Sequence, residues 1–146
     1  FNVRQGRVYT LLTGAFSHNE APHLIFNLLT LSSAAPTLLF QVGPEKFWTT
    51  YVTGALAGSA ASLLVHTGDY HSLGASGALY AILGFGAAMA DQSPRVIYLG
   101  LELSRKESLF ASLALEALTR RDSVDIAMHV GGAMAGAAYC VHLTDG

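Results

Sequence analysis

The sequence predicts an all-α fold, a polytopic bundle of transmembrane helices. Of the 146 residues, 51% are hydrophobic and only 12% are charged, against about 25% in a typical soluble domain. The mean hydropathy is +0.40. Four stretches contain no Asp, Glu, Lys or Arg: 21–43, 47–68, 70–90 and 126–144. Since about 20 apolar residues cross the hydrocarbon layer as a helix, each stretch is long enough to span a bilayer.

These stretches predict one membrane domain over residues 1–146. Residues 1–21 are mixed in character and are expected to form a loop or interfacial segment. The predicted spans cover about 22–42, 47–66, 73–90 and 126–143. Gly43-Pro44 marks a turn between the first two spans. The chain starts at Phe1 with no positively charged leader, which predicts an internal, N-terminally truncated fragment or a processed form.

A fifth, short helix is predicted at 105–119, although hydropathy alone does not indicate a span there. Glu116 and a cluster of charges at the start of this segment interrupt its apolar character. The prediction rests on the number of times that the chain crosses the membrane. Ser76 lies near the start of the third span and His129 near the start of the last. They reach the same membrane surface only if the chain crosses once more between residues 91 and 125.

Ser76 and His129 are the first candidates for chemistry, because polar side chains are costly inside hydrocarbon and indicate function there. In a catalytic dyad the imidazole takes the hydroxyl proton and the alkoxide attacks a carbonyl carbon. Each residue also has an ordinary explanation. Serines in membrane helices often donate to the carbonyl one turn back. Histidines at span ends, such as His66 and His142, are often interfacial.

His23, Asn27 and Tyr80 could support such a dyad. His23 and Asn27 are four residues apart and therefore share one face of the first span. Both can donate hydrogen bonds to a developing oxyanion, or they can instead join helices within the bundle. Tyr80 lies one turn after Ser76 and could stack on the base, or it could be an ordinary buried aromatic residue.

Small residues four apart predict close contacts between helices, with the third and last spans as the natural pair. Gly54 and Gly58 form one GxxxG pattern, and Gly132 and Gly136 form another, while Gly77 follows Ser76 in the third span. An isolated GxxxG in a glycine-rich membrane protein is explained equally well by composition.

Several other functions are disfavoured. A net charge of −2 leaves no basic patch for nucleic acid. The chain has no HExxH motif and no ligand-like cluster of histidines, so no metal or other cofactor is expected. Residues 74–78 lack the second glycine of the nucleophile elbow found in soluble α/β-hydrolases.

Three separate spans thus carry polar groups near one surface, and this arrangement resembles the rhomboid family of intramembrane serine proteases. The resemblance covers nearly the whole chain. Its motifs are residues 12–18, the HxxxN of His23 and Asn27, the GxSG of 74–77, Tyr80, and 127–132 followed by Gly136.

The resemblance implies a serine endopeptidase with Ser76 as nucleophile and His129 as general base. His23, Asn27 and the Ser76 backbone N–H would form the oxyanion hole, and Tyr80 would pack against the His129 ring. A dyad without a carboxylate would leave His129 oriented by packing alone. The expected partners are the lipid bilayer and single-span membrane proteins, which would be cleaved in or near their transmembrane segments.

Within the family, the mitochondrial (presenilin-associated, PARL-like) branch is most similar, on residues 13–18, 42–47, 72–78 and 125–129. The mitochondrial inner membrane is therefore the favoured location, with a bacterial or other cellular membrane as the alternative. His18 also fits the family pattern, in a structural role.

The chain also departs from the family pattern. Of the six helices in the family core, the first is missing here and five are expected. Met128 stands where alanine is usual. The alternative function is therefore a catalytically inactive rhomboid-like pseudoprotease that binds membrane-protein clients.

Overall fold

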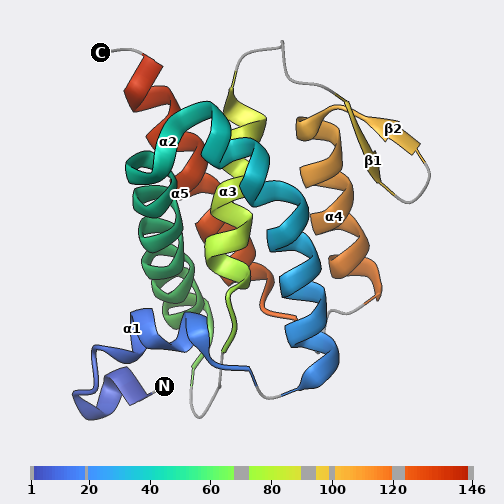
Figure 1. The fold of residues 1–146 in the computed structure, drawn as a ribbon. Helices are drawn as coiled ribbons and strands as arrows, with labels where there is room; N and C mark the ends of the chain where they lie inside the picture. The colour runs from blue at the N-terminus through green and yellow to red at the C-terminus, as the bar shows by residue number, and fades with distance from the viewer. Residues whose placement is uncertain are drawn as a thin grey trace.

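The computed structural model describes residues 2–18, 20–67, 73–89, 95–98, 101–119 and 124–144. These residues form a helical bundle in which successive rods run in alternating directions (Figure 1). The prediction of an all-α membrane bundle is confirmed, with the addition of one short β-hairpin. Residue 72, which belongs to the stretch 72–78 that resembles the mitochondrial branch, and residue 90, the end of the predicted span 73–90, lie outside the described part of the chain.

Helix α2 (Ala21–Val65) consists of two rods that meet at Gly43. Gly43 has φ 80° and ψ 168°, a conformation that only glycine adopts without strain, so the helical hydrogen-bond ladder breaks there. Pro44 follows and suits the first position of the second rod, because its missing N–H would have no helical partner. Figure 1 shows the first rod rising from the end of the bundle that carries the N-terminus and the second descending.

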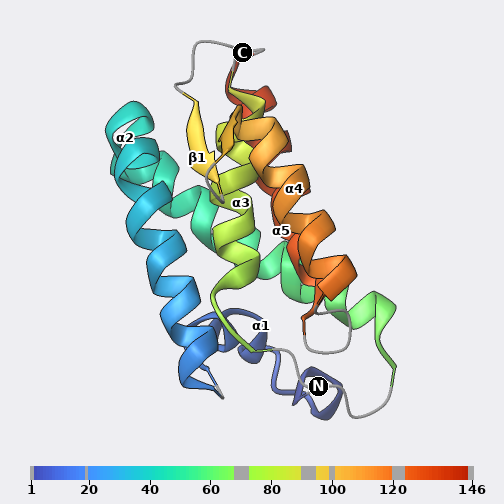
Figure 2. The ribbon, with the colours of Figure 1, turned by 90° about the vertical axis from the view of Figure 1, so that its right-hand side faces the viewer.

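The segment before α2 contains three short helical turns, η1 (Asn2–Gln5), α1 (Thr10–Thr13) and η2 (Gly14–Phe16). This segment lies across the end of the bundle where α3 and α5 begin (Figures 1 and 2). It is tied to the bundle through Ser59 of α2, whose hydroxyl donates to the Leu11 carbonyl at 2.8 Å, and through Gly74, whose N–H donates to the Gly14 carbonyl at 3.0 Å.

Helix α3 (Ser76–Ala88) is the centre of the bundle and packs against both α2 and α5 (Ile126–Thr144). Nearly every residue of α3 is buried. Helix α5 approaches α3 very closely. A Cβ added at Gly132 would overlap the carbonyl oxygen of Gly77, and one at Gly136 would overlap that of Ala81. Because glycine has no side chain, these positions allow the backbones of α3 and α5 to be in direct contact.

Strands β1 (Val96–Tyr98) and β2 (Leu101–Leu103) form an antiparallel hairpin, which lies along the chain after α3 and before α4 (Arg105–Thr119). A capping box opens α4: Ser104 Oγ accepts the Glu107 N–H at 3.2 Å, and Glu107 Oε2 accepts the Ser104 N–H at 2.7 Å. Helix α4 then runs back along α3 and α5 (Figure 2).

Two of the described helices, α2 and α5, are long and apolar enough to cross a membrane, and α3 is apolar but shorter. Large apolar side chains cover much of the surface, with Phe40 92% exposed and Leu64 86% exposed. Apolar surface of this extent is typical of a membrane-embedded protein. That α4 also crosses the bilayer stays a prediction.

Candidate active site

Ser76 is the first residue of α3 and is only 7% exposed. Gly74, two residues earlier, has φ 126° and turns the chain into the helix. The first N–H groups of a helix have no helical acceptor and carry the positive end of its dipole. The Ser76 side chain therefore lies where negative charge is stabilised.

His129 lies in the first turn of α5 and is 4% exposed. Its ring stacks on that of Tyr80, with centroids 4.3 Å apart and planes inclined by 17°. Tyr80 is one turn after Ser76 on α3. The first turns of α3 and α5 thus bring the predicted nucleophile, base and supporting ring into one buried region.

The Ser76 hydroxyl donates to Met128 Sδ at 3.7 Å. Within the described part of the chain, no hydrogen bond joins Ser76 to His129. Catalytic hydrogen bonds in enzymes without substrate are often long and form only in the complex. Met128, the acceptor of this hydrogen bond, directly precedes His129 on α5.

A carboxylate that the sequence reasoning did not assign to the site contacts the histidine. Glu116 Oε2 of α4 lies 2.7 Å from His129 Nδ1 and accepts the Tyr80 hydroxyl at 2.9 Å. The expectation that packing alone orients His129 is therefore wrong. An acidic residue isolated in an apolar run was the available signal, since intramembrane carboxylates indicate function as histidines do.

His23 and Asn27 project from the first turns of α2 toward the loop that precedes Ser76. A Cβ at Gly74 would lie 2.8 Å from His23 Cε1 and 3.4 Å from Asn27 Nδ2. Only a glycine therefore lets this loop approach the two side chains so closely. The structure brings both side chains beside residue 74, as an oxyanion hole near Ser76 would require.

His18 also belongs to this cluster. Its Nε2 lies 2.8 Å from Asn27 Nδ2 and accepts the Ala75 N–H at 3.4 Å. A backbone N–H can only donate, so Nε2 carries a lone pair and the Asn27 amide also donates to it. The His18 ring additionally meets the His23 ring edge-on at 5.3 Å. His18 thus holds Asn27 in place and links the loop before Ser76 to α2.

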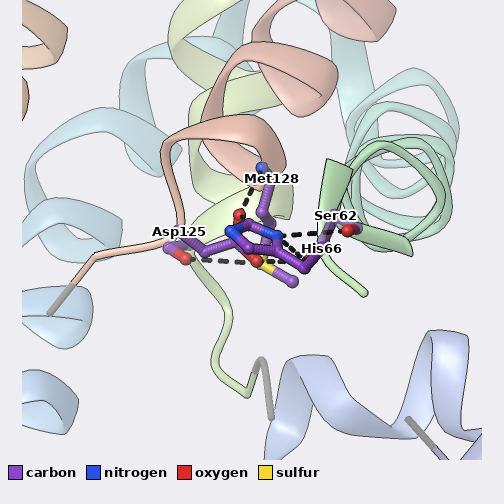
Figure 3. A network of polar contacts seen from close by, with 5 residues as sticks. Ser62, His66, Asp125 and Met128 are labelled. Carbon is purple, nitrogen blue, oxygen red and sulfur yellow. Dashed lines mark hydrogen bonds and ion pairs between the residues drawn. The ribbon is translucent and has the colours of Figure 1, made fainter. Parts of the chain in front are cut away.

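A second polar network fixes the start of α5 (Figure 3). Asp125 Oδ1 accepts the Met128 N–H at 3.0 Å, as the N-cap of a helix does. Its Oδ2 accepts the hydroxyl of Ser62, and His66 Nδ1 lies 3.9 Å from Oδ1. Both partners come from the end of α2, so α2 and α5 are joined one turn before His129.

Within the described residues, no group of three or more His, Cys, Asp or Glu side chains has the arrangement of a metal site. The hydroxyl of Ser76, the imidazole of His129 and the carboxylate of Glu116 are groups that can take part in nucleophilic and acid–base chemistry.

Comparison with known proteins decides the family. The model of the rhomboid domain matches residues 5–145. The chain belongs to the rhomboid family. This rhomboid chain is 33% identical over 141 residues to mitochondrial Rhomboid protein 1 of Saccharomyces cerevisiae, an alignment covering 89% of the chain and 40% of that relative.

Two further relatives are similar to this rhomboid chain. Rhomboid-like protease 3 of Toxoplasma gondii is 30% identical over 135 residues, which is 90% of the chain and 50% of the relative. Rhomboid protease GluP of Bacillus subtilis is 35% identical over 82 residues, which is 56% of the chain and 16% of the relative. The chain therefore spans half or less of the length of these relatives. The resemblance to the mitochondrial type of rhomboid is confirmed by the yeast relative.

Proposed function

We propose that this rhomboid is an intramembrane serine endopeptidase that hydrolyses peptide bonds in or near the transmembrane segments of single-span membrane proteins. The observation that carries the proposal is the convergence of α3 and α5. Ser76 and His129 are both buried in the first turns of these helices, and Tyr80 joins the helices by stacking on the imidazole.

In this mechanism His129 Nε2 takes the proton of the Ser76 hydroxyl, and the Ser76 oxygen attacks the carbonyl carbon of the substrate. The tetrahedral intermediate then loses its amine, which receives the proton from His129, and an acyl-enzyme remains. Water then hydrolyses the acyl-enzyme in the same way. His129 takes a proton from the water, and the resulting hydroxide attacks the ester carbonyl. The Ser76 oxygen recovers its proton from His129 as the carboxylic acid product leaves.

The developing oxyanion requires hydrogen-bond donors placed in advance. His23, Asn27 and the Ser76 backbone N–H are the proposed donors. Asn27 has two N–H bonds, so its contact with His18 Nε2 leaves a second donor for substrate. The positive end of α3 adds to the stabilisation of negative charge at this position.

The substrate is expected to arrive as a membrane helix. A helical peptide bond has its carbonyl occupied by the hydrogen bond of the residue four places on, so the substrate must unwind before attack. Small or helix-breaking residues near the cleavage site would lower the cost of that step. The similarity to the yeast mitochondrial protein supports a mitochondrial location, and within the mitochondrion the inner membrane is the location we propose.

A second candidate is a rhomboid-like pseudoprotease that binds membrane-protein clients. The observation in its favour is the Ser76 hydroxyl, which donates to Met128 Sδ rather than to the imidazole. Such a protein would bind single-span proteins without cleaving them.

The experiment is cleavage of a single-span substrate by the full-length protein in liposomes, with Ser76→Ala and His129→Ala beside the wild type. Ser32→Ala and His142→Ala are matched controls, because Ser32 only donates to the Leu29 carbonyl of its own helix and His142 is exposed near the end of α5. We expect both site variants to lose activity by a factor on the order of 10³ or more, and both controls to keep it.

Equal cleavage by wild type and Ser76→Ala would overturn the protease assignment. Binding of a panel of single-span proteins, with no cleavage of any of them by the folded wild type, would favour the pseudoprotease.

A further inference from the structure

Glu116 occupies a position in α4 that the dyad mechanism does not use. Its side chain is 14% exposed and that of His129 only 5%, so the pair lies within the bundle. Ser112, one turn earlier on the same helix face, lies 2.9 Å from the Tyr80 hydroxyl. Leu109 and Leu113 pack on the same side of α4 beside Tyr80. Ser112 and Glu116 are therefore the polar residues of this face that meet Tyr80 and His129.

The ionised form of Glu116 would set where the protons lie. A carboxylate without a proton only accepts, so in that form His129 Nδ1 and the Tyr80 hydroxyl both donate to Glu116 Oε2. The single Tyr80 hydroxyl proton is then used, and Ser112 is the donor to the Tyr80 oxygen. With its proton at Nδ1, the neutral imidazole carries its lone pair at Nε2. That is the tautomer a general base needs toward a serine hydroxyl.

The charge of Glu116 is the second part of the argument. A buried carboxylate is costly unless it is paired and hydrogen-bonded, and in a membrane protein such a group indicates function with a named partner. The partner here is the ring that gains a proton during the reaction. When His129 becomes an imidazolium, Glu116 is in contact with the new positive charge.

We propose that Glu116 is a positioning residue that turns the Ser76–His129 pair into a Ser-His-Glu triad. It holds the imidazole in the Nδ1–H tautomer and stabilises the imidazolium, as the acidic member of serine-protease triads does. The proposal rests on the proposed function, because a triad requires that Ser76 and His129 act as nucleophile and base.

The test compares Glu116→Gln and Glu116→Asp with Glu107→Gln in the full-length protein in liposomes. Glu107→Gln is a matched control, since it removes the same charge from the same helix while glutamine still completes the capping box with Ser104. We expect Glu116→Gln to lower kcat about 100-fold with KM within about twofold of wild type. Glu116→Asp is expected to recover part of the loss, and Glu107→Gln to behave as wild type.

Two further measurements separate a positioning role from a structural one. In a His129→Ala background, Glu116→Gln should cause no additional loss, because the two residues act as a unit. Histidine ¹⁵N NMR should show an Nδ1-protonated ring whose signal disappears in His129→Ala and shifts in Glu116→Gln but not in Glu107→Gln.

The possible failures are distinguishable. If wild type cleaves and Ser76→Ala does not, a kcat for Glu116→Gln within twofold of wild type overturns the triad and leaves the protease assignment intact. An equal loss in the His129→Ala background overturns it as well. If wild type and Ser76→Ala cleave equally, the triad falls together with the proposed function, and the NMR signal then shows only whether the carboxylate and ring are paired.

Discussion

Gly132 of α5 lies directly on the carbonyl of Gly77 in α3, so that a Cβ on residue 132 would overlap that oxygen. Since Gly77 follows Ser76 and Gly132 is three residues after His129, this contact sets the separation of the two helices at the candidate site. A backbone atom cannot move aside as a flexible side chain can, so the two helices must separate if residue 132 is enlarged.

Gly132→Ala is therefore expected to destabilise the bundle by about 1–3 kcal/mol or more, the usual cost of overpacking a core. Gly86→Ala is the matched control, because a Cβ there would lie 3.4 Å from the Arg105 side chain, an ordinary contact. Alanine at 86 should be neutral or stabilising by up to about 1 kcal/mol through helix propensity. Thermal unfolding in detergent micelles measures both, and equal midpoints for the two variants would contradict the prediction.

Gly74→Ala should impair catalysis more than folding. The residue has φ 126°, and its Cβ would lie 2.8 Å from His23 Cε1, so the proposed oxyanion donor must move. Gly6→Ala introduces a side chain at φ 83° with nothing within 4 Å, and so isolates the cost of the backbone conformation. We expect kcat to fall by at least about tenfold for Gly74→Ala, roughly the effect of disturbing an oxyanion donor. A Gly6→Ala variant with the same loss would argue against it.

Tyr80→Phe separates the two contacts of the Tyr80 side chain. Phenylalanine keeps the stacking on His129 but removes the hydroxyl that joins Ser112 and Glu116. Leaving buried polar groups short of a partner costs about 1–3 kcal/mol. We expect kcat to decrease in the order wild type, Tyr80→Phe, Tyr80→Leu, because leucine loses the stacking as well. Tyr139→Phe, ten residues beyond His129 on α5, is the control and should match wild type.

Asp125→Ala is expected to weaken the start of α5. The variant loses the N-cap of the helix, worth about 1 kcal/mol, and leaves the buried Ser62 hydroxyl without its acceptor. Asp125→Asn retains a capping oxygen and should fall between the wild type and Asp125→Ala. Unfolding midpoints test the order, and in a Ser62→Ala background the loss from Asp125→Ala should be smaller. An Asp125→Ala protein as stable as wild type would rule out the capping role.

Local sequence patterns predicted the parts of this fold that depend on neighbouring residues. The break after the first rod follows from Gly43-Pro44, because glycine permits the positive φ and proline begins the next helix. The face shared by His23 and Asn27 follows from their spacing. The segment 105–119 was not predicted from a local pattern but from the number of membrane crossings; the structure has helix α4 at those residues, and its crossing of the bilayer stays a prediction.

The pairing of Glu116 with His129 could not be predicted in this way. It depends on which residues of α3 and α5 lie opposite α4, and those contacts join segments that are distant in the sequence. The β-hairpin was also missed, because its strands, Val96–Tyr98 and Leu101–Leu103, are only three residues each and too short to show the alternation that indicates a strand. Asp125 was visible as the residue before the last span, but its partners Ser62 and His66 are distant in sequence.

Asp125 and Glu116 restrain different degrees of freedom of the same imidazole. The Asp125 carboxylate fixes the first turn of α5, and its carbonyl accepts the His129 N–H at 3.2 Å, so this residue sets where the Cα of the histidine lies. Glu116 contacts His129 at the ring, not at the backbone, and so sets the rotation of the ring about the side-chain torsions. Translation and rotation of the ring are thus controlled from two separate segments of the chain, one joined to α2 and the other carried by α4.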